Sequence, residues 1–61
     1  MKDTYKILEF LNDHWQTVAI IQRKKTAEMI FGTLQKDFPE STVKLVDPDG
    51  EDLFVQTPRV K

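Results

Sequence analysis

Residues 43–55 read VKLVDPDGEDLFV, and this run predicts a β-hairpin around a well-specified turn. Pro48 presets φ at the second turn position, and Asp47 suits the corner before it. Gly50 supplies the residue with positive φ that a three-residue hairpin loop with a bulge requires. The turn chemistry therefore predicts one strand ending near Val46 and a second beginning near Asp52.

The register of this hairpin follows from placing the bulge at Gly50. Leu45 is then expected to face Leu53 on an apolar surface that packs into the core. Lys44 is expected to face Phe54 on the opposite, mixed surface. A slip of one residue would exchange the two surfaces, so the hydrophobic pattern predicts a single register.

Two segments have the apolar spacing of amphipathic helices. Residues 3–15 place apolar side chains at helical intervals, and Asp3 or Thr4 is a suitable N-cap. Residues 26–38 carry the clearest helical stripe in the chain, with Thr26 as the expected N-cap. Pro39 is expected to end this second helix, because the residue before proline is disfavoured in the α region. Gly32 within it suggests a close approach by another element.

Residues 17–22 read TVAIIQ and favour a buried strand, because they are rich in β-branched residues. A short apolar run of this kind is also compatible with a helix, so periodicity alone leaves both assignments open. The strand is favoured because a continuous helix from residue 17 to residue 38 would place Lys24 in the middle of its apolar stripe.

These elements predict one small α+β domain over residues 1–61, in the order α-β-α-β-β. The expected sheet has three antiparallel strands in the order 2-3-1 and is covered by two helices. This order of elements resembles a pared-down winged helix, with the C-terminal hairpin as the wing, which implies nucleic-acid binding. The chain has one helix where that family has two between strand and wing. Asp47, Asp49, Glu51 and Asp52 also make the wing tip acidic.

Composition excludes several classes of protein. Hydrophobic residues make up 39% and charged residues 31%, which is typical of a folded soluble domain. The absence of cysteine excludes disulfides and cysteine-ligated metals, and it fits a cytoplasmic location. The longest apolar run covers residues 18–21, so no membrane span is expected. With a net charge of −1, no general attraction to nucleic acid is evident.

Catalysis has little support in this sequence. His14 is the sole histidine and Ser41 the sole serine, and no spacing combines them into a catalytic set. The acidic residues at 47–52 do not match the spacing of a calcium loop, because Gly50 at the sixth position would make Leu45 the first ligand and Gln56 the twelfth. We therefore expect no enzyme activity, no catalytic residues, no cofactor and no metal.

The candidate binding residues are Arg23, Lys24 and Lys25, together with Lys44 and Phe54. Three cations just before a helix N-terminus are able to hold a phosphate group, although a solvated connection explains them as well. Phe54, opposite Lys44 and away from the core, is a candidate for stacking on a base or docking a partner.

The function expected from these features is a small, non-enzymatic protein-interaction or regulatory module. Its partner is an unidentified protein or a second copy in a homodimer, because a domain of this size without disulfides gains stability from association. Tyr5, Phe10 and Phe54 fall outside the best core stripes and favour self-association. Nucleic-acid binding through the basic residues is the less favoured alternative.

Overall fold

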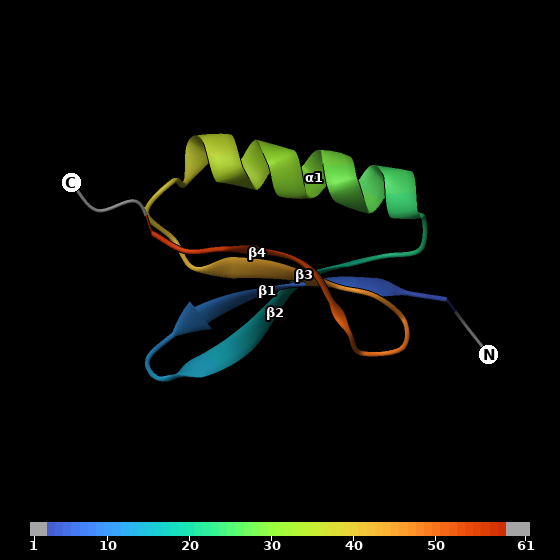
Figure 1. Ribbon diagram of the computed structural model, residues 1–61, viewed down its shortest axis with the longest axis horizontal. Coiled ribbons are helices and arrows are strands. Elements are labelled where there is room, and N and C mark those ends of the chain that lie inside the picture. Colours follow the sequence, from blue (N-terminus) through green and yellow to red (C-terminus); the bar gives the residue numbers. More distant parts are fainter. Residues whose placement is uncertain (1–2, 59–61) are drawn as a thin grey trace.

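A computed structural model describes residues 3–58, which form a four-stranded antiparallel sheet with one helix packed on one face (Figure 1). The sheet order is β2-β1-β3-β4, so β1 and β3 are central and β2 and β4 are edge strands. The element bounds in chain order are β1 Tyr5–Leu11, β2 His14–Ile21, α1 Lys24–Asp37, β3 Val43–Val46 and β4 Asp52–Gln56. The predicted α+β class is correct, but the predicted α-β-α-β-β order and the 2-3-1 sheet are wrong.

The N-terminal segment is a β-hairpin and not the helix predicted over residues 3–15. β1 pairs with β2 from Tyr5–Ile21 to Leu11–His14. Asn12 and Asp13 connect the strands with φ values of 53° and 68°, which is the arrangement of a two-residue type I′ turn. Asparagine and aspartate tolerate this left-handed region better than other non-glycine residues. The turn therefore forms without a glycine to mark it in the sequence.

β2 confirms the strand assignment for residues 17–21, but the strand begins three residues earlier, at His14, and ends at Ile21. It pairs with β1 and not with the last strand of the C-terminal hairpin. β1 lies in the centre because it also pairs with β3. The resemblance to a winged helix does not hold, because a hairpin replaces the first helix.

α1 covers one face of the sheet and begins two residues before the predicted start. Arg23 is the N-cap, and its carbonyl accepts a hydrogen bond from the Ala27 N–H at 2.9 Å. Thr26 lies inside the helix and is not the N-cap. The helix ends as predicted just before Pro39, with the Phe38 N–H bonded to the Leu34 carbonyl at 2.8 Å.

The C-terminal hairpin has the predicted turn but a different register. Asp47 Oδ1 accepts the N–H groups of Asp49 at 2.9 Å and Glu51 at 2.8 Å, and Gly50 has a φ of 90°. Beyond the turn, Leu53 is an extra residue in β4, so Leu45 pairs with Phe54. The expected pairs Leu45–Leu53 and Lys44–Phe54 are wrong, because this second bulge shifts the rest of the strand by one residue.

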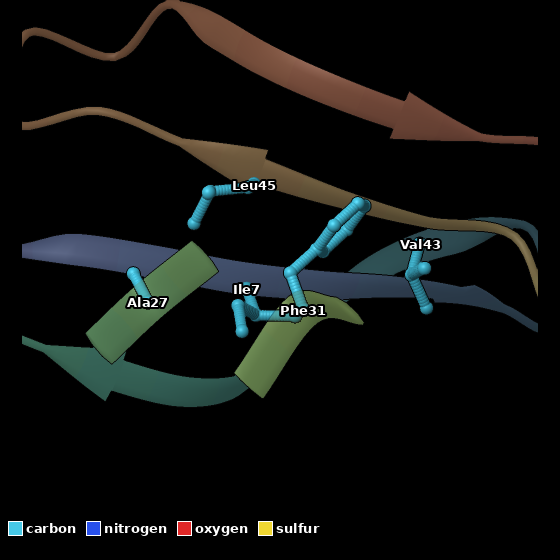
Figure 2. Packing of buried hydrophobic residues seen from close by; sticks show 5 residues of the cluster. All are labelled: Ile7, Ala27, Phe31, Val43 and Leu45. Atoms are coloured by element: carbon cyan, nitrogen blue, oxygen red, sulfur yellow. The ribbon is translucent and has the colours of Figure 1, made fainter. Parts of the chain in front are cut away.

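The core lies between α1 and the two central strands. Ile7 and Leu45 are fully buried and face each other across β1 and β3. Ala27 and Phe31 reach them from α1, and Val43 completes the cluster, as Figure 2 shows. Gly32 lies outside it: a Cβ built there would meet nothing within 4 Å, so the predicted close approach at Gly32 is wrong. Within residues 3–58, no helix is long and apolar enough to cross a membrane.

Candidate interaction surface on the sheet

The face of the sheet opposite α1 carries a second set of apolar side chains. Successive residues of a strand point to opposite faces, so the neighbours of buried Ile7 and Leu45 point away from the helix. No other element in residues 3–58 covers this side (Figure 1). We call this side the open face. Its apolar members, drawn from all four strands, are Leu8, Phe10, Trp15, Ile20, Val46 and Val55.

Four of these residues are substantially exposed. The exposed fractions are 63% for Ile20, 54% for Val55, 41% for Phe10 and 37% for Trp15. Together these four residues expose an area on the order of 400 Å². They are spread over β1, β2 and β4, with Leu8, Thr17 and Lys44 between them on the same face. Patches of this size on small proteins often mark binding surfaces.

One end of the open face is aromatic. Phe10 and Trp15 form a cross-strand pair with ring centroids 5.2 Å apart and an interplanar angle of 63°, an edge-to-face contact. The Nζ of Lys44 lies 4.4 Å from the centroid of the Trp15 ring. These contacts use the favourable directions of the ring quadrupoles and fix the orientation of the indole.

Lys44 is also neutralised within the chain. Its Nζ lies 3.4 Å from Asp52 Oδ1, and the lysine side chain is 20% exposed. An ion pair at this level of exposure contributes little to stability, roughly 0–1 kcal/mol. Its consequence for the surface is greater, because it removes an uncompensated charge from the middle of the open face.

The predicted binding residues do not come together on one surface. Lys44 lies on the open face, whereas Phe54 lies on the helix side and stacks on Phe31 with centroids 6.0 Å apart. Phe54 is 47% exposed at the rim of the core and does not face Lys44, so the expected Lys44–Phe54 pair is replaced by an aromatic contact with α1.

Arg23, Lys24 and Lys25 are exposed at the start of α1, on the side of the sheet that carries the helix. The first turn of α1 contains no acidic residue, and the three cations interact unfavourably with the positive, N-terminal end of the helix dipole. They form a separate basic cluster, away from the open face.

His14 has a structural setting beside the β1–β2 turn. Its Nδ1 lies 3.0 Å from the Asn12 carbonyl oxygen, and its Nε2 lies 3.3 Å from Gln16 Nε2. In residues 3–58, no three histidine, cysteine, aspartate or glutamate side chains gather as a metal site would require. The His14 ring therefore contacts the backbone of the β1–β2 turn.

A groove also runs along the outer side of α1 near β4. It has a volume of about 670 Å³ and is lined by Met29, Gly32 and Lys36 of the helix and Gln56 of β4, among others. The Gln56 amide donates to the carbonyls of Phe38 at 3.1 Å and Ser41 at 2.8 Å, so it fastens the helix C-terminus to the sheet. Gln56, one of several polar residues that line this groove, thus has a structural role.

The open face was only partly visible in the sequence. The sequence predicts Phe10 outside the core, but it places residues 3–15, which include Phe10 and Trp15, in a helix and not in two paired strands. The signal that was available is the apolar character of both alternate positions along residues 5–11. Comparison with protein-family models, curated proteins and solved structures finds no significant match for this chain.

Proposed function

We propose that this chain is a non-enzymatic protein-interaction module that docks another protein chain, of its own or of a different kind, on its open face. The observation that carries the proposal is the apolar patch that extends over four strands on the side of the sheet without a helix. Burying an exposed apolar side chain of the size of Ile20 or Phe10 is worth roughly 1.5–3 kcal/mol when it is complete. Ile20 is 63% and Phe10 41% exposed, so covering each one yields the corresponding part of this free energy, and several such contacts together offset the cost of association.

The ring arrangement favours a protein over a nucleic acid as the partner. Base stacking needs accessible ring faces. One face of Trp15 is occupied by Lys44, and Phe10 is engaged edge-to-face with Trp15. The ammonium group of Lys44 is itself paired with Asp52, which lowers its value for a phosphate. Apolar packing onto a flat surface requires neither free ring faces nor free cations.

Nucleic-acid binding is the weaker alternative, and the exposed cluster Arg23, Lys24 and Lys25 is the observation that favours it. Replacing all three with glutamine should then weaken binding to single- or double-stranded DNA and flatten its dependence on salt. Protein docking on the open face predicts that the same triple variant leaves complex formation unchanged.

Site-specific photo-crosslinking in the native host tests the proposal. A benzophenone side chain replaces Ile20 on the open face in one variant and Met29 on the outer side of α1 in a matched control. The two positions are similarly exposed, at 63% and 69%, and both carry apolar side chains. We expect a discrete protein adduct from position 20 and none from position 29. Equal labelling at both positions, or a nucleic-acid adduct at position 20, would contradict the proposal.

A further inference from the structure

We infer that the occupant of the open face is a second copy of this chain, packed face to face across a two-fold axis. The inference rests on the proposed function, because it names the partner for the same surface. The resulting dimer would have four layers, with two sheets in contact at the centre about 10 Å apart and one α1 on each outer side.

The edge strands β2 and β4 are poorly suited to pair with a strand of another chain, which favours association through the open face. Both edge strands contain a bulge: Val18 is the extra residue in β2, and Leu53 is the extra residue in β4. A bulge bends its strand and interrupts the regular row of N–H and C=O groups that an added strand would need. Strand addition at either edge is therefore disfavoured, and the apolar face is the larger unsatisfied surface.

The charge distribution permits the face to meet itself. A two-fold interface places the same patch on both sides, so an unpaired charge near its centre would meet its own copy. Lys44 is paired with Asp52 inside each chain, and this removes such a conflict. Lys6 lies at the end of the face beside Ile20 and Val46, far from the Phe10–Trp15 pair.

The open face has an aromatic end and an aliphatic end, and this difference determines the direction of the two-fold axis. An axis in the interface and perpendicular to the strands places the aromatic end of one copy over the aliphatic end of the other. Lys6 of one copy then approaches Phe10 and Trp15 of the other copy, and large side chains meet smaller ones. An axis parallel to the strands would instead place the two aromatic ends over each other and both Lys6 side chains at the same opposite end of the interface.

The available area predicts a weak dimer. Four strands about 4.8 Å apart and four to eight residues long give a face of roughly 400 Å² in projection. Two such faces bury about 1,000 Å² of accessible surface in total, at the lower end of specific interfaces. We therefore expect dissociation in the micromolar range or above, so the protein must be observed up to near-millimolar concentration.

Sedimentation equilibrium of the whole chain measures this association. The mass should rise from 7.2 kDa at low concentration towards twice that value. Ile20→Lys should raise the dissociation constant at least about tenfold, since it places a charge in the apolar contact. Met29→Lys introduces the same charge at a similarly exposed position on the helix and should leave the constant unchanged. Val55→Lys is a second open-face variant, and retained amide dispersion shows that each variant is folded.

A nuclear Overhauser effect between two side chains of the open face tests the dimer independently, in the unmodified protein. Trp15 and Ile20 pair with Phe10 and Lys6, which are four residues apart along β1, so they are separated by about 13 Å, too far for an effect within one chain. A cross-peak between the Trp15 indole and an Ile20 methyl group at high concentration therefore reports the other copy. In a sample that is half isotope-labelled, the same peak should survive filtering for contacts between chains.

The outcomes separate this inference from the proposed function. A constant mass of 7.2 kDa up to near-millimolar concentration overturns the dimer. A dimer that persists in Ile20→Lys and Val55→Lys, or that lacks the filtered cross-peak, also overturns it. If a different protein is crosslinked at position 20 in those cases, the proposed function stands without the dimer. If no protein is crosslinked there either, both fail.

Discussion

The two hairpins of this domain use different turns. In the C-terminal hairpin, Asp47 accepts two backbone N–H groups and Gly50 takes the left-handed position. In the N-terminal hairpin, Asn12 and Asp13 both adopt positive φ without a glycine. A non-glycine residue in this region costs roughly 1 kcal/mol. The C-terminal turn is shaped by residues that suit it, Asp47 and Gly50. The N-terminal turn is instead held in its conformation by the two strands that it joins.

The largest expected effect tests whether the hairpins depend equally on the core. Ile7 in β1 and Leu45 in β3 are fully buried and face each other. Ile7→Ala and Leu45→Ala should each lower the free energy of unfolding by about 2–5 kcal/mol, enough to unfold much of so small a domain. Denaturation in urea followed by circular dichroism measures the loss. Tolerance of one variant alone would show that its hairpin folds with little help from the other.

A smaller loss is expected at the dedicated turn. Asp47→Ala removes the Oδ1 that accepts the Asp49 and Glu51 N–H groups, and should cost about 1–2 kcal/mol. Asp47→Asn retains an acceptor oxygen and should cost less. Both values come from urea midpoints at constant slope. Equal losses would assign the effect to the charge of Asp47 instead of to its hydrogen bonds.

Introducing a glycine into the N-terminal turn should stabilise the domain, whereas removing the glycine of the C-terminal turn should destabilise it. Asp13→Gly should stabilise by about 0.5–1 kcal/mol, because Asn-Gly suits a type I′ turn without strain. Gly50→Ala should destabilise by roughly 1 kcal/mol. The cause is backbone strain at a φ of 90° and not a clash, because a Cβ at Gly50 would meet nothing within 4 Å. Thermal melts compare the pair, and destabilisation by Asp13→Gly would contradict the strain assigned to the N-terminal turn.

The smallest expected effect concerns Lys44, whose side chain makes contacts in both hairpins. Lys44 in β3 contacts Trp15 in β2 and pairs with Asp52 in β4. Lys44→Met keeps most of the aliphatic stem and removes the charge, so about 0.5 kcal/mol should be lost. Asp52→Asn removes the ion pair alone and should cost less. Urea denaturation at low and high salt measures both, and a loss for Asp52→Asn that does not shrink with salt would contradict an exposed ion pair.

Turn and helix chemistry could be predicted from the sequence where single residues impose it. Pro39 marked the end of α1, and Pro48 and Gly50 marked the C-terminal turn. The N-terminal hairpin was missed because apolar residues occupy both alternate positions of β1. Ile7 packs under α1 while Leu8 and Phe10 lie on the open face, so the period of two disappears and a helical spacing emerges. The surface proposed for binding is thus the physical cause of the wrong assignment.

The two bulges and the open face could not be predicted from the local sequence, because both depend on how the strands pair. Val18 and Leu53 are inserted relative to partner strands, and no local composition specifies where such an insertion falls. The bulge at Leu53 moved Phe54 from the surface of Lys44 to the side of Phe31. Phe10 was recognised as a residue in excess of the core, but its neighbours on the open face became apparent only with the strand order.

The pairing of β1 with β3 has a consequence for how quickly the chain folds. Each hairpin closes locally, whereas the contact between Ile7 and Leu45 joins positions 38 residues apart in the chain, from 7 to 45. Such distant pairing carries a larger loop-closure entropy than either turn, and it slows folding more than local contacts do. The barrier should therefore lie at the meeting of two preformed hairpins. Because the N-terminal turn is already formed at such a barrier, Asp13→Gly should change the folding rate at least as much as Ile7→Val does in stopped-flow experiments, relative to their effects on stability.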